Sequence, residues 1–403
     1  MNDFAAELNR RLDDIRADGL YRELRRIDSP QSAHIEVGGK TLLNFSSNDY
    51  LGLANHSALK EAAAKAVEKF GCGSGASRLI CGSLAPHHEL EAALADFKGA
   101  EAAVSFSSGY AAAIGTICAL MSKDDVIVID KLVHACVVDA ARLSGAKLRV
   151  FAHNDLAELE DILRWTDQRK ADSERSNVLI ITESVFSMDG DLAPLAEIVA
   201  LKEKYNAWLM IDEAHATGLF GKHQRGLAEA AGVSDKIEVQ MGTLGKALGS
   251  AGGFICGSRA LVDFLVNRAR SFIFSTAPVP AAAAAAHAAI KLLQSAEGQK
   301  RCRQLWSLVD QTKTQLGEKG WPVSNIRSPI IPLIIGDEAC TLATAADLRK
   351  AGFFIPAIRY PTVARGQARL RLTLSATHSA KDLDQLFAAL ANVPSLTPEM
   401  RHV

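Results

Sequence analysis

A lysine set among glycines is the residue of this sequence best placed to do covalent chemistry. Lys246 lies in the segment GTLGKALG, residues 242–249, directly after an apolar run typical of a buried strand. Small neighbours let other groups approach closely, and no acidic residue stands beside the lysine. A desolvated lysine can lose its proton and act as an imine-forming nucleophile. An ordinary loop lysine would look the same in this window alone, so the upstream residues must decide.

The segment around Lys246 is not a phosphate-binding P-loop. That motif requires glycine five residues before Gly245, where Gln240 stands. It also requires serine or threonine after the lysine, where Ala247 stands.

Acidic and histidine side chains follow several apolar, strand-like runs. Asp212 ends the run at 208–211, and His215 follows three residues later. The other reactive side chains in such positions are Glu183, Asp130 and His134. Ligands of open α/β sheets bind at the carboxyl ends of the strands, so we expect these groups to gather near Lys246.

Two alternatives for these side chains have specific sequence requirements. Asp212, His215 and His134 could hold a metal ion, but no His-Glu-x-x-His motif or cysteine cluster accompanies them. We therefore expect no metal. A serine hydrolase of the nucleophile-elbow type is excluded because Gly-x-Ser-x-Gly does not occur.

The combination of Asp212 and Lys246 indicates pyridoxal phosphate as the cofactor. A lysine holds this cofactor as an imine, and an aspartate beside the pyridine nitrogen favours the protonated, electron-withdrawing ring. Thr243 can add a hydroxyl to a phosphate cradle. The small residues at 107–110 stand between a predicted strand and a predicted helix, where free backbone N–H groups bind anions.

The composition is that of a large globular protein without a general affinity for polyanions. The 403 residues suffice for two or three domains of about 100–200 residues each. A net charge of -1, from 45 basic and 46 acidic residues, predicts binding neither to nucleic acid nor to a membrane. Seven cysteines without a Cys-x-x-Cys pair, and a charged N-terminal helix in place of a signal peptide, predict a cytoplasmic protein.

Strands and helices alternate through the middle of the chain, which predicts an α/β fold with a mainly parallel sheet. The expected strands of this sheet are 101–106, 126–129, 147–151, 178–182, 208–211, 237–241 and 253–256. Before them we expect a helix at 1–26, a hairpin at 34–45, a helix at 57–70 with a serine cap, a glycine-rich loop at 71–78 and a helix at 87–97.

Pro278 and Pro280 mark the predicted domain boundary. After them come an alanine-rich helix and strands at 330–335, 353–358 and 368–374, which predict a smaller α+β domain. The expected division is an N-terminal helix with short strands at 1–52, a large cofactor-binding domain at 53–280 and a small domain at 281–403.

Four segments together resemble the α-oxoamine synthases, a family of fold-type I pyridoxal-phosphate enzymes. They are NFSSNDYLGL (44–53), FSMDGDLAPL (186–195), DEAHATG (212–218) and GTLGKALG (242–249). The likeness runs from about Arg22 to the helix after His378. Members of this family condense an amino acid with an acyl-CoA and release carbon dioxide, and the resemblance implies that activity and fold here.

The resemblance also implies a role for individual residues. Lys246 would hold the cofactor and shuttle a proton, Asp212 would pair with the pyridine nitrogen, and His215 would bind the ring hydroxyl. His134 would stack on the ring face and contact substrate. The phosphate region would be held by Ser108, Gly109, Tyr110, Ser187 and Thr243, with Ser275 and Thr276 of a partner subunit. Further substrate contacts are implied for Arg22, Asn48, Thr362 and Arg371.

Arg371 would clamp the amino-acid carboxylate through a two-point contact. The alternative interpretation of Arg371, from its position in an alternating strand, is an ion pair on the strand face.

The resemblance extends to the substrates and the assembly. AIRYPTV (357–363) followed by ARLRLTLSATHS (368–379) resembles members that join L-alanine to pimeloyl-CoA or a pimeloyl carrier protein in biotin biosynthesis. GSGASRLICG (73–82) and GTLGKALG also match 2-amino-3-ketobutyrate ligases and 5-aminolevulinate synthases, so the reaction type follows more directly than the acyl chain. A homodimer with shared active sites is implied.

A non-catalytic pyridoxal-phosphate carrier or regulatory protein is the alternative from a different functional class. The joint presence of Lys246, Asp212 and Arg371 argues against it.

Overall fold

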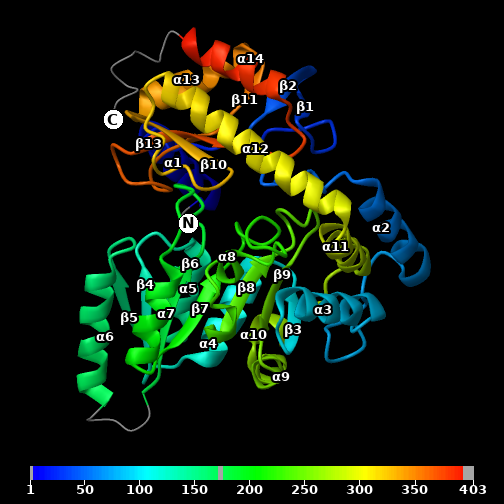
Figure 1. Cartoon of the computed structure of the whole chain (residues 1–403), viewed down its shortest axis with the longest axis vertical. Coiled ribbons are helices and arrows are strands. Elements are labelled where there is room, and N and C mark those ends of the chain that lie inside the picture. The colour runs from blue at the N-terminus through cyan, green and yellow to red at the C-terminus, as the bar shows by residue number, and fades with distance from the viewer. Residues whose placement is uncertain (1–2, 171–175, 394–403) are drawn as a thin grey trace. The chain divides into compact units, whose positions relative to one another are not determined.

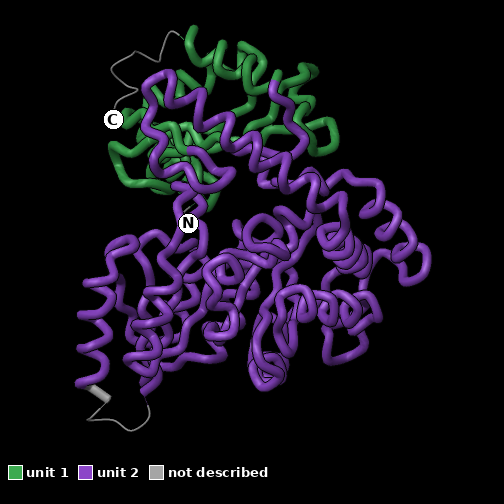
Figure 2. Tube along the Cα trace, viewed as in Figure 1, with its two compact units in different colours: residues 1–46, 332–372, 381–403 green, residues 47–331, 373–380 purple. Residues whose placement is uncertain are grey.

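The computed structural model describes residues 3–170 and 176–393, and the chain forms two compact units (Figure 2). Unit 1 contains residues 1–46, 332–372 and 381–403, and unit 2 contains residues 47–331 and 373–380. The boundary expected at Pro278 and Pro280 falls inside unit 2. The reason is that α11 (Pro280–Leu293) packs against α2 (Ser57–Phe70) and α3 (Ala85–Lys98), which belong to the same unit.

A seven-stranded sheet forms the centre of unit 2, in the order β3-β9-β8-β7-β6-β4-β5 (Figure 1). The strands are β3 (Ala102–Phe106), β4 (Val126–Asp130), β5 (Lys147–Phe151), β6 (Val178–Glu183), β7 (Trp208–Asp212), β8 (Val239–Thr243) and β9 (Gly253–Gly257). Neighbours from β8 to β5 are parallel, and β9 is antiparallel to both β3 and β8. The predicted α/β fold with a mainly parallel sheet is therefore confirmed.

Helices pack on this sheet because its strands are apolar on both faces. One core contains Val104, Ile127 and Met210 together with residues of the packed helices. Val128 and Ile180, which point the other way, are also fully buried, and such strands appear in the sequence as unbroken apolar runs. The packed helices are α3, α4 (Gly109–Leu120), α5 (Ala135–Ser144), α6 (Leu156–Lys170), α7 (Leu195–Lys204) and α9 (Arg259–Arg268), and α10 (Arg270–Ile273) packs against α4 and α9.

Unit 1 and its border segments form two three-stranded sheets, β1-β2-β11 and β10-β13-β12. Their strands are β1 (His34–Val37), β2 (Lys40–Asn44), β10 (Ile330–Gly336), β11 (Phe353–Phe354), β12 (Ala357–Ile358) and β13 (Ala368–Thr373). The single strand predicted at 353–358 is wrong, because β11 pairs with β2 whereas β12 pairs with β13. Pro356 lies between them and has no N–H with which to continue a ladder.

Two predicted helix ends also differ from the structure. The first helix, α1 (Phe4–Ala17), ends well before residue 26, and Gly19 follows with φ 67°, a conformation that glycine adopts easily. The cap of α2 is His56 rather than Ser57, since the His56 Nδ1 accepts the Ala58 N–H at 3.2 Å. The remaining helices are α8 (Leu227–Ala230), a 3-10 turn (Ser234–Lys236), α12 (Ala296–Glu318), α13 (Glu338–Lys350) and α14 (Ala380–Ala391).

The hairpin predicted at 34–45 is present, with Gly38 and Gly39 at positive φ in its turn. None of the helices formed by the described residues is long and apolar enough to cross a membrane.

Candidate active site

One small cavity of unit 2 collects most of the predicted reactive residues. Its volume is about 190 Å³. Glu183 and Asp212 end the parallel neighbours β6 and β7, and β8 ends at Thr243 shortly before Lys246, so these side chains meet at one sheet edge. The lining residues are Gly109, Tyr110, His134, Cys136, Glu183, Asp212, Ala214, His215, Met241, Thr243 and Lys246.

Lys246 is the end of a chain of polar contacts that runs into the core. Its Nζ lies 2.7 Å from the His215 Nε2, and the Tyr50 hydroxyl lies 2.6 Å from the His215 Nδ1. Tyr50 is fully buried. Contacts at both nitrogens fix the orientation of the imidazole ring and couple its protonation to both neighbours.

Tyr50 is a site residue that the sequence analysis did not identify. The available signal was its place in the NFSSNDYLGL segment, two residues after Asn48. The Tyr50 hydroxyl donates a hydrogen bond to the Asn48 Oδ1 at 3.4 Å. Asn48 therefore approaches the site through Tyr50, and it is not among the residues that line the cavity.

Asp212 is a buried acid, 6% exposed, whose Oδ1 accepts the Ala214 N–H at 2.8 Å. Burial raises the pKa of Asp212, and the Lys246 ammonium acts in the opposite direction. A carboxylate that is removed from water is stable in its charged form only beside a cation. A protonated pyridine nitrogen is such a cation, so this acid fits the proposed cofactor.

Glu183 stands opposite Asp212 in the register of β6 and β7. Burial, and then the neighbouring Asp212 carboxylate, raise the pKa of Glu183 to about 8. Its Oε2 accepts the Ser187 N–H at 3.2 Å, whereas its buried Oε1 has no hydrogen-bond partner among the described residues. A buried oxygen of this kind calls for a donor from a bound molecule or for a proton of its own. The sequence analysis noted Glu183 as a strand-end acid but gave it no role.

His134 has the properties of a neutral, flat ring at the cavity mouth. Its Nδ1 accepts the Cys136 N–H at 3.2 Å, which leaves the ring proton on Nε2. Desolvation by the surrounding protein lowers the pKa of His134, and Asp212 opposes that change. The adjacent Cys136 stays a thiol, because burial raises its pKa to about 12. A neutral imidazole suits stacking on an aromatic ring.

The N-terminus of α4 supplies an anion-binding end to the cavity. Ser108 caps this helix, accepting the Ala111 N–H at 3.0 Å, while Thr243 donates to the Gly252 carbonyl at 3.0 Å. A Cβ atom on Gly253 would lie 2.6 Å from the Gly109 Cα, so only glycine lets β9 approach the helix start. Free N–H groups of a first helical turn bind phosphate well. The residues present thus fit both ends of pyridoxal phosphate.

The other predicted site residues lie outside the lining of this cavity. Ser187 adjoins it through the Glu183 carboxylate. Ser275 and Thr276 lie beside the glycine-rich loop, where Thr276 forms a β-bridge with Ser77. Arg22, Thr362 and Arg371 belong to unit 1; Arg22 and Thr362 are exposed, and Arg371 is buried on β13.

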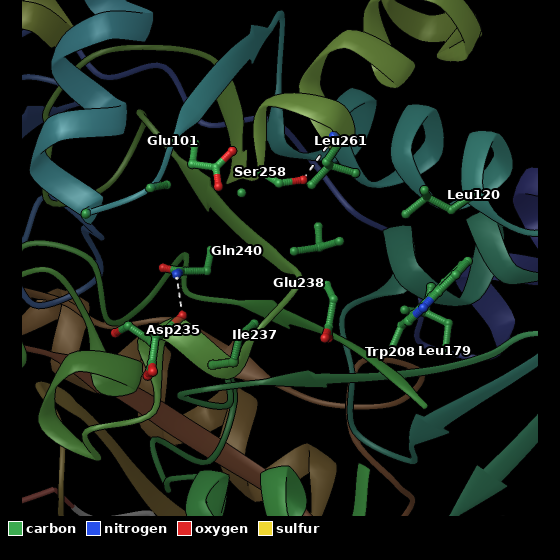
Figure 3. Close-up of a pocket in the computed structure, with 15 residues that line it drawn as sticks. Glu101, Leu120, Leu179, Trp208, Asp235, Ile237, Glu238, Gln240, Ser258 and Leu261 are labelled. Atoms are coloured by element: carbon green, nitrogen blue, oxygen red, sulfur yellow. Dashed lines mark hydrogen bonds between the residues drawn. The ribbon is translucent and has the colours of Figure 1, made fainter. Parts of the chain in front are cut away.

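A larger cavity of about 520 Å³ borders the opposite, amino-terminal ends of β6, β7 and β8 (Figure 3). Its wall is apolar at Leu179, Trp208 and Ile237 and carries carboxylates at Glu101 and Glu238. Its described lining includes neither lysine nor histidine. The chemistry of the lining, and not the volume, therefore identifies the smaller cavity as the candidate site. Among residues 3–170 and 176–393, no three His, Cys, Asp or Glu side chains are grouped as a metal site requires.

Comparisons with known proteins show the family of this chain. The profile of the family described as aminotransferase class I and II matches residues 40–390. An 8-amino-7-oxononanoate synthase of Geotalea daltonii is 46% identical over 382 residues, which cover 95% of this chain and 96% of that protein. An 8-amino-7-oxononanoate synthase of Anaeromyxobacter sp. (strain Fw109-5) is 49% identical over 386 residues, covering 96% and 95%.

A comparison with solved structures supports the fold and the cofactor. A serine palmitoyltransferase from S. paucimobilis, solved with bound PLP, superimposes with a TM-score of 0.90 at 27% identity. The match covers 98% of this chain and 100% of that one.

Proposed function

Because the chain belongs to the aminotransferase class I and II family, and within it to the pyridoxal-phosphate-dependent α-oxoamine synthases, we propose that it makes 8-amino-7-oxononanoate for biotin biosynthesis. The reaction joins L-alanine to the pimeloyl group of pimeloyl-CoA or a pimeloyl carrier protein and releases carbon dioxide and the thiol. The observation that carries the proposal is the small cavity lined by both Lys246 and the buried Asp212. We also propose that the enzyme works in the cytoplasm.

The side chains of the cavity divide the work between proton transfer and charge. When bound, pyridoxal phosphate supplies an electron sink for a carbanion at the amino-acid Cα. Lys246 would hold the cofactor covalently, and its amine, once free, would take the Cα proton and later return one. Asp212 would keep a positive charge on the pyridine nitrogen. His215, 2.7 Å from the Lys246 Nζ and supported by Tyr50, orients the lysine and binds the ring oxygen.

The remaining cavity residues position and shield the reacting atoms. The neutral His134 ring would cover one face of the cofactor and exclude water from the Cα. The start of α4 and Thr243 would bind the phosphate and so hold the ring beside Asp212. Accurate positioning of this kind supplies a large share of enzymatic rate enhancement.

A product assay tests the proposed substrates. Purified holoenzyme is supplied with L-alanine or glycine and with acetyl-, succinyl- or pimeloyl-CoA, or with pimeloyl carrier protein, and the aminoketone is identified by mass. We expect alanine with a pimeloyl thioester to give the highest kcat/KM. A preference for glycine with acetyl-CoA would instead identify a 2-amino-3-ketobutyrate ligase, and no product from any pair would favour a cofactor carrier.

Arg371→Lys is expected to weaken L-alanine binding by about 1–3 kcal/mol, the cost of partly losing a charged hydrogen bond. A guanidinium contacts a planar carboxylate at two points, whereas an ammonium offers one point charge. Titrating alanine against the cofactor spectrum measures this loss. Arg369→Lys is the matched control, since Arg369 is equally buried on β13 and its Nε donates to the Gln367 carbonyl at 3.0 Å. Equal alanine affinity in wild type and Arg371→Lys would make Arg371 a structural ion-pair residue.

We also propose that the enzyme is a homodimer whose active sites are shared. The glycine-rich loop and the segment after α10 support this, because Ala277 N–H donates to the Ala76 carbonyl at 3.0 Å and joins them into one surface. This surface carries large exposed apolar side chains: Leu79 (51% exposed), Ile80 (78%) and Phe274 (70%). Clustered exposed apolar groups mark contact surfaces, and Ser275 and Thr276 would reach the partner's phosphate from here.

Hybrid dimers test the sharing of sites. We expect Lys246→Ala and Thr276→Glu subunits to be inactive alone, since the second places a negative charge beside the phosphate. Mixing them should restore activity, because each hybrid then has one site with its own Lys246 and the partner's Thr276. Mixtures that stay inactive, with hybrid formation verified by tagged subunits, would assign Thr276 to its own chain's site or to none.

A further inference from the structure

His153 connects three loops at the carboxyl edge of the large sheet and is not among the residues that line the small cavity. It follows β5, and its Nδ1 lies 3.1 and 3.2 Å from the two carboxylate oxygens of Asp130, the last residue of β4. Its Nε2 lies 2.7 Å from the Asp191 Oδ2, in the segment after β6. A ring that donates from both nitrogens to carboxylates is an imidazolium.

Asn154 closes the same cluster. Its backbone N–H donates to the Asp130 Oδ2 at 2.8 Å, and its Nδ2 donates to the Asp191 Oδ2 at 3.1 Å. Asn154 has φ 56°, so the chain turns sharply here to bring both groups inward. We call His153, Asn154, Asp130 and Asp191 the histidine clamp.

One end of the histidine clamp holds the loop that carries His134. The Asp130 Oδ1 accepts the Leu132 N–H at 2.7 Å, and the Asp130 carbonyl accepts the Val133 N–H at 3.3 Å. His134 is the next residue and lines the cavity. Because Asp130 is fully buried, its carboxylate depends on the His153 cation for charge balance.

The other end holds the segment 185–192, which carries Ser187. This segment is closed by the bridge between Val185 and Leu192 and by the Phe186 N–H, which donates to the Asp191 carbonyl at 3.1 Å. The Phe186 ring packs edge-on to His153, with ring centroids 4.3 Å apart. Ser187 then donates its N–H to Glu183 in the cavity wall. Two walls of the cavity are thus tied together through one ring.

We propose that His153 is a positioning residue: as a cation between Asp130 and Asp191 it locks the His134 loop and the 185–192 segment into the geometry that holds the cofactor. The inference rests on the proposed roles of His134 and Ser187. His153 is not among the cavity-lining residues, so it acts through these two neighbours and not on the reacting atoms.

The charge of His153 sets the pH range in which the histidine clamp works. Partial burial disfavours the charged ring, but the hydrogen bonds to Asp130 and Asp191 outweigh it and raise the pKa of His153 to about 10. The unfolded value lies near 6.5. A raised pKa means that the stabilisation is complete below about pH 6.5 and is lost as the pH rises through about 10. The two aspartates are the charged groups that face the ring, and Asn154 and Phe186 are neutral.

Hydrogen exchange of the apoenzyme tests directly whether the histidine clamp holds the two segments in place. In His153→Gln we expect residues 131–134 and 185–192 to exchange about 10- to 100-fold faster, the factor for a lost hydrogen bond to a charged group. His223→Gln is the matched control, since it breaks a histidine–carboxylate contact to Glu229 (2.6 Å) that is not part of the cavity lining. Unchanged exchange at 131–134 and 185–192 in His153→Gln would refute the proposal.

Cofactor binding separates positioning from a merely structural role. His153→Gln should raise the Kd for pyridoxal phosphate about tenfold and change the visible circular dichroism of the bound cofactor, as one lost charged contact would. Looser loops with an unchanged Kd and an unchanged dichroism would mean that the clamp supports the fold only. These measurements use no substrate, so they are independent of the proposed alanine and pimeloyl specificity.

A series of Tm measurements at different pH values tests whether His153 is positively charged in the histidine clamp. The difference in Tm between apo wild type and apo His153→Gln should be largest below about pH 6.5 and should shrink as the pH rises from there through about 10. Asp191→Asn, which removes one of the two charges holding the ring proton, should move this loss to lower pH. A Tm difference that does not vary with pH would show that His153 is not a cation in the clamp and would overturn the proposal.

Discussion

Lys246→Ala should lose covalent attachment of the cofactor and all measurable turnover. Alanine offers no amine to hold pyridoxal phosphate and no base at the substrate Cα. General acid–base catalysis alone contributes about 10²- to 10⁴-fold, so the fall should be at least that large. Covalent attachment is measured by the absorption of the lysine-bound cofactor and by borohydride trapping followed by peptide mapping. Turnover is measured by the product assay.

The fold of this variant should survive, because Lys246 is only half-buried at the cavity and its replacement removes a charge. Lys222→Ala, at an exposed lysine outside the cavity lining, controls for general effects of losing a lysine. Borohydride-stable cofactor on Lys246→Ala would show that another residue holds the cofactor.

Asp212→Asn should keep the fold and lose most exchange of the alanine Cα proton. The amide has nearly the same shape as the carboxylate, but it cannot favour a protonated pyridine nitrogen. Breaking a buried ion pair by neutralising one partner costs about 3–5 kcal/mol, which corresponds to a roughly 10²- to 10⁴-fold slower exchange. Deuterium incorporation into alanine in D2O, without an acyl donor, measures this step alone.

Asp235→Asn is the control for Asp212→Asn, since Asp235 is exposed and lines the larger, opposite cavity. Its exchange rate should equal that of wild type. Near wild-type exchange in Asp212→Asn would assign the charge on the ring nitrogen to a different group, for which Glu183 is the neighbouring candidate.

Residues whose environment is local could be identified from the sequence. Asp212 ends an unbroken apolar run, and Lys246 follows another such run amid glycines, so their positions after buried strands predict both at the carboxyl edge of a sheet. The order of strands and helices, and therefore the fold class, follows from the same short-range pattern. The resemblance to a family added predictions for the cofactor's other contacts, and these stay predictions.

Residues whose importance comes from packing between distant segments could not be identified in this way. Tyr50 meets His215 across 165 positions of the chain, and His153 meets Asp191 across 38. The same limit explains the error at 353–358, since the partners of β11 and β12 lie in different sheets. Periodicity reports which face of a strand is apolar, but it does not report which strand will be its neighbour.

The pairing of β3 with β9 also determines when the cofactor can help the protein fold. β3 is the earliest strand of the large sheet along the chain, yet Ala102 pairs with Gly257 on the latest one. Closing so long a loop carries an entropic cost, so locally connected βα units form sooner. The phosphate end of the cavity lies between the start of α4, directly after β3, and Gly253 on β9, so it is completed only when this pairing forms. Pyridoxal phosphate would then bind only the folded protein. We expect excess cofactor to raise the Tm by mass action and to leave the refolding rate of the apoprotein unchanged, which thermal melts and refolding kinetics with and without cofactor measure.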